Sequence, residues 1–164
     1  ADNRVLVFDF DSTFVQIESL DYLLQHIASE HQKPSEAAKL HQITELAMNG
    51  QFSFRESLDL RVKAFKIHKS HIDWVANVLK EHITPSFHRN QSFFQENADR
   101  IFILSGGFIE IIWPVVKSFG IRFEHVFANR FLYDHLGHVV DFDRNNPLSQ
   151  DQGKVFQLNS LHLR

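Results

Sequence analysis

The stretch Arg4-Val5-Leu6-Val7-Phe8-Asp9-Phe10-Asp11-Ser12-Thr13 decides the fold of this chain. Residues 4–8 form a short apolar, β-branched run without polar alternation, which is typical of a strand buried on both faces of a parallel sheet. Asp9 and Asp11 follow this strand directly, and alternate side chains of an extended chain lie on one face. We therefore expect both carboxylates in the crevice at the carboxyl ends of the strands, where open α/β sheets bind ligands.

Two carboxylates at this position suit Mg²⁺, a hard cation that takes oxygen ligands and keeps waters and substrate phosphate around it. One carboxylate can attack phosphorus to give an aspartyl phosphate, and the other can protonate the departing oxygen. The pattern leaves open which residue has which role. By itself an Asp-x-Asp pair is weak evidence, because an ordinary polar loop between a strand and a helix gives the same pattern.

A second candidate element for phosphate binding lies further along the chain. Residues 100–104 repeat the pattern of a buried strand, and Ser105-Gly106-Gly107 follows them as a predicted glycine turn. An apolar helical run then covers residues 108–119, and Gly120 is expected to end it. A hydroxyl and unobstructed backbone N–H groups at the positive end of a helix can hold phosphoryl oxygens, although an ordinary tight turn has the same residues.

Between the two strands the sequence predicts helices only. Apolar residues recur at helical spacing from residue 19 to residue 96. Pro34 is expected to start one helix, Asn49-Gly50 to end it, and residues 53–56 form a capping box that opens the next. We therefore expect an all-helical insertion.

After Gly120 the patterns of strands and a helix return. A strand is predicted over residues 125–128, a β-hairpin over residues 130–142 and a helix over residues 151–161. Lys154 in this last helix can neutralise charge on a transferring phosphoryl group. Strands that alternate with helices predict a doubly wound α/β fold with a parallel sheet.

The composition narrows the function classes. The 164 residues carry a formal charge of −3 without a block of lysine and arginine, so neither nucleic acid nor a membrane surface is an expected partner. No apolar run approaches the roughly 18 residues of a membrane-spanning helix. The chain has no cysteine, which excludes disulfides and thiolate metal sites, and its 11 histidines show no zinc-binding pattern. We expect a cytoplasmic protein.

In this order and at these structural positions, Asp9-x-Asp11, Ser105-Gly106 and Lys154 resemble motifs one to three of the haloacid dehalogenase superfamily of phosphatases. The resemblance extends to the phosphoserine phosphatase branch. Glu18, seven residues beyond Asp11, supports this closer resemblance. Further residues match the spacing of that branch: Met48, Phe54, Ser57-Leu58, Arg61-Val62, Leu104 to Phe108 and Phe127 to Arg130.

The resemblance implies roles for the residues around the two aspartates. Asp9 would be the nucleophile, and Asp11 the general acid and then the base that activates water. Mg²⁺ would be the cofactor, held by Asp9 and Asp11. The phosphoryl group would be bound by four residues: Thr13, Ser105, Gly106 and Lys154.

The same resemblance implies a substrate, which is a small phosphorylated amino acid. Glu18 would bind its ammonium group and Arg61 its carboxylate, while Met48 and Phe54 would line a helical cap. The cap would comprise residues 15–85 and the core residues 1–14 and 86–164, with the hairpin as a small flap. The implied reaction is hydrolysis of O-phosphoserine to serine, a step of serine biosynthesis.

The chain departs from the family pattern near its end. Family members continue past the helix of Lys154 into a strand and a glycine-aspartate turn that completes the Mg²⁺ shell, whereas nothing acidic follows Asp151 here. We expect the chain ending at Leu163-Arg164 to lack the third acidic ligand and to be inactive or weakly active. Gln152 would take the position of Lys154 if the register slipped by two. Asp141 and Asp143 are expected to be solvated turn charges.

Two other classes of function stay open. The same site can hydrolyse another small phosphomonoester or transfer the phosphoryl group to an alcohol. Alternatively, the chain is a non-catalytic domain of a larger protein. Substrate profiling distinguishes hydrolysis of another phosphomonoester from phosphoryl transfer to an alcohol. The sequence does not indicate the oligomeric state.

Overall fold

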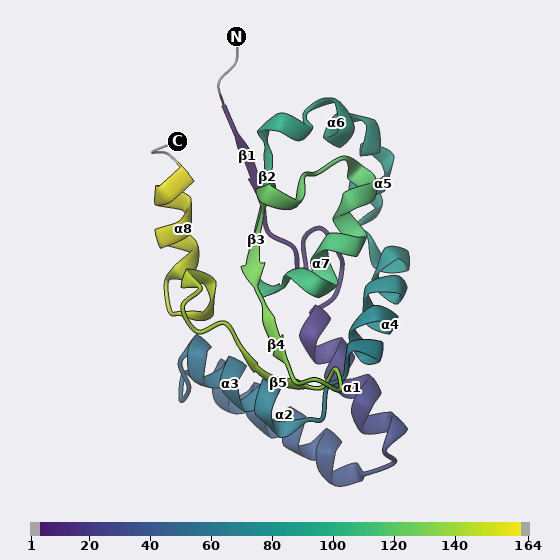
Figure 1. The fold of residues 1–164 in the computed structure, drawn as a ribbon, viewed down its shortest axis with the longest axis vertical. Coiled ribbons are helices and arrows are strands. Elements are labelled where there is room, and N and C mark those ends of the chain that lie inside the picture. Colours follow the sequence, from purple (N-terminus) through teal and green to yellow (C-terminus); the bar gives the residue numbers. More distant parts are fainter. Residues whose placement is uncertain (1–3, 162–164) are drawn as a thin grey trace.

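The computed structural model describes residues 4–161, which form an α/β fold around a parallel sheet (Figure 1). Its three strands lie in the order β1 (Leu6–Phe8), β2 (Ile101–Phe108) and β3 (Val126–Asn129). Val7 lies opposite Phe102, and Leu104 opposite Phe127. Helices α7 and α8 lie on opposite sides of this sheet in Figure 1. The predicted α/β fold with a parallel sheet is confirmed.

The insertion between β1 and β2 contains only helices, as predicted. Pro34 occupies the first turn of its helix, and the Ser53 side chain accepts a hydrogen bond from the Glu56 N–H at the start of another. Such a side-chain cap satisfies one of the free N–H groups at a helix start. The helical elements are α1 (Ser19–Glu30), α2 (Pro34–Met48), α3 (Phe54–Ala64), α4 (Lys69–Leu79), α5 (Pro85–Arg89) and α6 (Gln91–Glu96), with 3-10 turns at Lys80–His82 and Ala98–Arg100.

The predicted glycine turn at residues 105–107 is wrong. These residues continue β2 as far as Phe108, with an irregular register after Leu104. Neither Gly106 nor Gly107 has a positive φ, so neither is needed for a turn. Glycine is required there for close approach, because a Cβ on Gly107 would lie 3.1 Å from the Asp11 carboxylate.

The helix predicted after this strand is present in two parts. Helix α7 (Ile109–Val116) is followed by a 3-10 turn at Lys117–Phe119, and Gly120 ends it in the left-handed conformation with φ of 78°. A further 3-10 turn, Phe123–His125, leads into β3.

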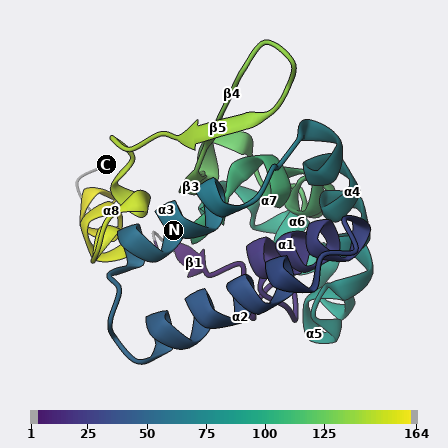
Figure 2. The same cartoon turned by 90° about the horizontal axis from the view of Figure 1, so that it is seen from below.

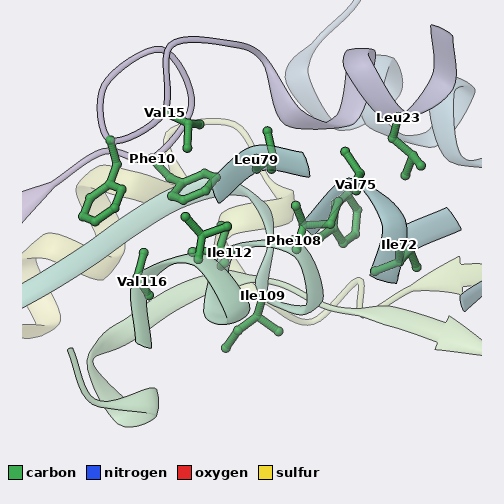
Figure 3. Packing of buried hydrophobic residues seen from close by; sticks show 14 of the residues in the cluster. Phe10, Val15, Leu23, Ile72, Val75, Leu79, Phe108, Ile109, Ile112 and Val116 are labelled. Atoms are coloured by element: carbon green, nitrogen blue, oxygen red, sulfur yellow. The ribbon is translucent and has the colours of Figure 1, made fainter. Parts of the chain in front are cut away.

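The hydrophobic core runs from the sheet into the helical insertion. Figure 3 shows Val75 and Leu79 of α4 facing Phe108 and Ile112, and all four belong to one buried cluster. The proposed boundaries between core and cap stay a prediction, because this cluster is continuous across them.

The two-stranded hairpin β4 (Phe131–Tyr133) and β5 (Val139–Phe142) stands out from the sheet in Figure 2. Hydrogen bonds attach it to the insertion: the Val139 N–H donates to the Ile67 carbonyl at 2.8 Å, and Lys63 Nζ to the Val140 carbonyl at 2.9 Å.

An ion-pair network makes a second attachment. Arg144 pairs with both Asp141 of the hairpin and Asp59 of α3. The prediction that Asp141 is a solvated turn charge is therefore wrong, because it lies in β5 and also faces Lys63 at 3.7 Å.

The described chain ends with the 3-10 turn Pro147–Ser149 and helix α8 (Gly153–Leu161). Leu163 and Arg164, on which the expectation of an incomplete core depends, lie outside the described residues. Within residues 4–161, no helix is both long and apolar enough to cross a membrane.

Candidate active site

Asp9 lies immediately after β1, an edge strand of the three-stranded sheet, on the side where the parallel strands have their carboxyl ends. Its Oδ1 accepts the Phe10 N–H at 2.7 Å, and its Oδ2 lies 2.9 Å from Lys154 Nζ in α8. The side chain remains 43% exposed. A cation and a backbone N–H therefore orient a carboxylate that is open to the surrounding cleft.

Asp11 is more deeply buried and has a different environment. Burial raises the pKa of its carboxyl to about 6, against the opposing effect of hydrogen bonding from Ser19; the negative charges of Glu18 and Asp9 raise it further. The Ser19 N–H, at the start of α1, donates to Asp11 Oδ1 at 2.8 Å. A carboxyl with this pKa can both give and take a proton near neutral pH.

The end of β2 brings backbone groups close to these carboxylates. Ser105, which is buried, accepts the Gly107 N–H on its Oγ at 2.9 Å. The Phe54 ring covers Gly106 so closely that a Cβ there would lie 2.8 Å from Phe54 Cζ. The glycines thus let both a carboxylate and an aromatic ring approach the strand.

Asn129, which belongs to a stretch that carries the family resemblance but was given no role in the sequence analysis, contacts this strand end. Its Nδ2 donates to the Gly106 carbonyl and to the Leu148 carbonyl, both at 2.9 Å. It is fully buried at the end of β3. The sequence feature that could have identified it is a polar residue at the end of an apolar predicted strand.

Most of the predicted site residues line one cleft of about 580 Å³. The cleft lies between the strand ends, the start of α8 and the helices α1 and α3. The predicted residues that line it are Asp9, Asp11, Glu18, Phe54, Arg61, Ser105, Gly106 and Lys154.

Two predicted site residues are not brought into the cleft. Met48, the last residue of α2, is 83% exposed and does not line it. Thr13 does not line it either, and its carbonyl accepts a hydrogen bond from the Thr84 hydroxyl. The roles that the family resemblance implies for these two residues stay predictions.

The two residues expected to bind the substrate's charged groups have protein partners. Glu18 accepts a hydrogen bond from the Ser12 hydroxyl at 2.8 Å. Arg61 Nε donates to Asp21 Oδ1 at 2.8 Å. Asp21 also lines the cleft and was missed by the sequence analysis, although it lies three residues after Glu18 and therefore close to the same face of α1.

Both candidates for the position of the last motif, Lys154 and Gln152, line the cleft. Lys154 reaches Asp9, while Gln152 lines the cleft with a positive φ of 58°. Between them Gly153 packs against the preceding turn, where a Cβ would lie only 1.8 Å from the Pro147 carbonyl oxygen. Asp151 accepts the Phe54 N–H at 2.9 Å, which links this loop to α3.

The described residues offer few donors for a metal ion. None of their histidine, aspartate and glutamate side chains form a group of three or more that could hold one. Asp9 and Asp11 nevertheless present carboxylate oxygens in one cleft. This donor type fits Mg²⁺, which commonly binds through one or two carboxylates and fills its shell with waters and substrate phosphate.

The fold and the cleft agree with the family comparison. The model of the haloacid dehalogenase-like hydrolase family matches residues 6–164. The chain therefore belongs to that family.

Curated relatives and solved structures point to one branch of it. The phosphoserine phosphatase of Drosophila melanogaster is 29% identical over 153 residues, which cover 93% of this chain and 54% of the relative. The chloroplastic phosphoserine phosphatase of Arabidopsis thaliana is 29% identical over 93% of this chain and 49% of its own length. The chain thus spans about half the length of these relatives.

A solved structure has a fold similar to that of this chain. The crystal structure of a phosphoserine phosphohydrolase-like protein from Francisella tularensis superposes with a TM-score of 0.77 at 29% identity. The match covers 96% of this chain and 72% of that one.

Proposed function

We propose that this cleft is the active site of a Mg²⁺-dependent phosphomonoester hydrolase that works through an aspartyl phosphate. The observation that supports this proposal most directly is that the two carboxyl groups have different environments. Asp9 is exposed and pairs with Lys154, whereas burial raises the pKa of Asp11 to about 6. Two carboxyl groups with different environments are suited to different roles, one as nucleophile and one as acid and base.

In the first half of the proposed reaction, an Asp9 carboxylate oxygen attacks phosphorus. The bond between phosphorus and the ester oxygen breaks, and protonated Asp11 gives its proton to the departing alcohol. The Lys154 ammonium, 2.9 Å from Asp9, offsets negative charge beside the transferring group. The products of this half are the alcohol and a phosphorylated Asp9.

In the second half, Asp11 is a carboxylate and acts as the base. It takes a proton from a water that attacks phosphorus, the bond between phosphorus and Asp9 breaks, and inorganic phosphate leaves. Asp11 is then protonated again, which closes the cycle. The Ser105 hydroxyl and the backbone at Gly106 bind phosphoryl oxygens throughout. The Asp9 carboxylate and the backbone carbonyl of Asp11 would hold Mg²⁺, which would supply positive charge at the phosphoryl group when bound.

The charges of the cleft favour a substrate with a cationic group. Two basic side chains line it, Arg61 and Lys154, against five acidic ones: Asp9, Asp11, Glu18, Asp21 and Asp151. A phosphate ester without a positive charge would be repelled by this excess unless a metal ion offsets it. An ammonium group near Glu18 and a carboxylate near Arg61 would complement the cleft.

O-Phosphoserine has these groups, and the relatives named as phosphoserine phosphatases support it as the substrate. The proposal extends to a role in serine biosynthesis in the cytoplasm. Another small aminated phosphomonoester is the second candidate, which the acidic excess also favours. The helical insertion is proposed to act as the cap over the cleft, because Phe54 and Arg61 of α3 line it.

Replacement of the nucleophile tests the proposal. Asp9→Asn is expected to abolish both turnover and phosphorylation of the protein while leaving the fold intact, because an amide is a poor nucleophile. Hydrolysis of O-phosphoserine with Mg²⁺ and acid-trapped phosphoprotein are measured on this chain and on any longer natural form that contains it. Asp73→Asn, at an exposed position of α4 outside the cleft, is the matched control. Phosphate trapped on another residue would refute the assignment of Asp9.

A further inference from the structure

Arg61 is the centre of a network that joins three helices of the insertion. Its Nε donates to Asp21 of α1 at 2.8 Å, its Nη2 to the Thr44 hydroxyl of α2 at 3.2 Å, and its Nη1 to Ser57 of its own helix α3. The Arg61 side chain is only 12% exposed. A guanidinium held on three sides and largely buried is fixed in orientation before any ligand binds.

The contact with Asp21 has a particular geometry. The hydrogen bond between the two side chains joins Nε to one oxygen of the Asp21 carboxylate. A guanidinium has five N–H donors. Nη1 donates to the Ser57 hydroxyl and makes a second, long contact of 3.5 Å with the Ser57 carbonyl, while Nη2 donates once, to Thr44. Donor capacity therefore remains on the terminal nitrogens, chiefly the second N–H of Nη2.

We propose that Asp21 is a positioning residue that determines specificity: it holds the guanidinium of Arg61 so that the terminal nitrogens meet the carboxylate of an amino-acid phosphomonoester. This inference rests on the proposed function. Asp21 and Arg61 both line the cleft, so the pair sits where a substrate would contact it. Asp21 acts through Arg61, and its own negative charge is not what attracts the ligand.

If Asp21 is a positioning residue, its hydrogen bond to Arg61 matters and its negative charge does not, and substitutions at position 21 can distinguish the two. An asparagine at position 21 keeps an oxygen that can accept the Nε–H and removes the negative charge. If Asp21 positions Arg61, Asp21→Asn preserves selectivity for the carboxylate and Asp21→Ala loses it. A residue that binds the substrate ammonium by charge would give the opposite result for asparagine.

The test is a double-mutant cycle on ligand affinity. All proteins carry Asp9→Asn, so that O-phosphoserine is not consumed, and the dissociation constant is measured by calorimetry with Mg²⁺. Asp21→Ala is expected to weaken binding on the order of tenfold, as for loss of a hydrogen bond to a charged group. Asp21→Asn should stay within about threefold of the parent, and Asp21→Ala should add nothing when Arg61 is already alanine.

O-Phosphoethanolamine, which lacks the carboxylate, is the matched ligand, and its affinity should not respond to either position. An equal loss for both ligands would reduce Asp21 to a folding role. A further loss from Asp21→Ala in the Arg61→Ala background would show that Asp21 contacts the ligand directly. Either result overturns the inference.

Failure of the proposed function has a different signature. If the Asp9→Asn parent binds O-phosphoserine no better than O-phosphoethanolamine, the proposed substrate is wrong and the inference falls with it. If the parent discriminates between them and Asp21→Ala does not change that, the inference alone is wrong. Should Asp21→Ala fail to fold, Asp21→Ser, whose side chain stops short of Arg61 Nε, takes its place.

Discussion

Glu110, in the first turn of α7, supports a prediction about pH and stability. Both of its carboxylate oxygens accept the Phe131 N–H, at 3.2 and 3.1 Å, where the hairpin begins. Burial raises the pKa of Glu110 to about 7, although that hydrogen bond and the charge of Arg130 act in the opposite direction. The folded protein therefore holds a proton there that the unfolded chain releases at lower pH.

The sign and size of the effect follow from linkage. Because the pKa in the folded state exceeds its ordinary value of 4.5, the contribution of Glu110 to stability is fully present below pH 4.5. It is lost as the pH rises through about 7. The rise in the pKa of Glu110, at about 1.4 kcal/mol per pKa unit, corresponds to a loss of at most about 3 kcal/mol in the free energy of unfolding. Partial exposure of the carboxyl to solvent reduces this loss to about 2 kcal/mol.

Glu110→Gln removes the titration and keeps an oxygen that can accept the Phe131 N–H. We expect the variant and the wild type to have nearly equal free energies of unfolding at pH 4.5, and the variant to be about 2 kcal/mol more stable at pH 8. Urea unfolding at a series of pH values measures both. Glu96→Gln, at an exposed position in α6, is the matched control. A difference that does not change with pH, or a variant less stable at pH 8, would refute the reasoning.

Three substitutions in the cleft have expected outcomes of different kinds. Arg61→Ala should cost phosphoserine hydrolysis about 2–5 kcal/mol of transition-state stabilisation if its pair with the substrate carboxylate is desolvated, and cost hydrolysis of phosphoethanolamine much less; equal losses in kcat/KM would assign Arg61 to folding. Gly106→Ala should lower the free energy of unfolding by about 1–3 kcal/mol, because its Cβ would meet the Phe54 ring at 2.8 Å. The loss should shrink in a Phe54→Ala background, and an undiminished loss would contradict the assigned clash. Gly153→Ala should destabilise the protein by several kcal/mol, since its Cβ would meet the Pro147 carbonyl oxygen at 1.8 Å. Gly50 is the comparison: its φ is 71°, and a Cβ there would have no atom within 4 Å. Gly50→Ala should therefore cost only about 1–2 kcal/mol, and similar losses for Gly50→Ala and Gly153→Ala would count against a steric cause at Gly153.

The sequence predicted the parts of the site that depend on local pattern. Asp9 and Asp11 follow an apolar strand, which was predicted to be buried on both faces but is only partly buried at Leu6–Phe8. The carboxyl ends of parallel strands lie on one side of a sheet, so the placement of the two aspartates required no knowledge of distant residues. The glycines at positions 106 and 107 were located correctly but given the wrong physical reason. Their requirement comes from Phe54 and Asp11, which approach from other elements and leave no local signal.

The residues that were missed depend on tertiary contacts. Asp21 becomes part of the site only because α1 and α3 bring it against Arg61, 40 positions away. Glu110 has its unusual environment because β4 begins at its carboxylate. Met48 shows the converse case: its spacing matched the family, but the last turn of α2 leaves its side chain in solvent. Spacing along a chain fixes the face of a helix, and packing decides what that face meets.

Helix α3 connects the two sides of the cleft that are proposed to bind the substrate and its phosphoryl group. It carries Arg61 and begins at Phe54, whose N–H is held by Asp151 in the loop just before Lys154. Its other side is attached to the hairpin through Asp59 and Arg144. A displacement of α3 away from α8 would break its bond to Asp151, which lies three residues from the lysine that contacts Asp9. Because the charged groups of the second attachment are partly exposed, each ion pair there contributes little to the free energy that holds α3 in place.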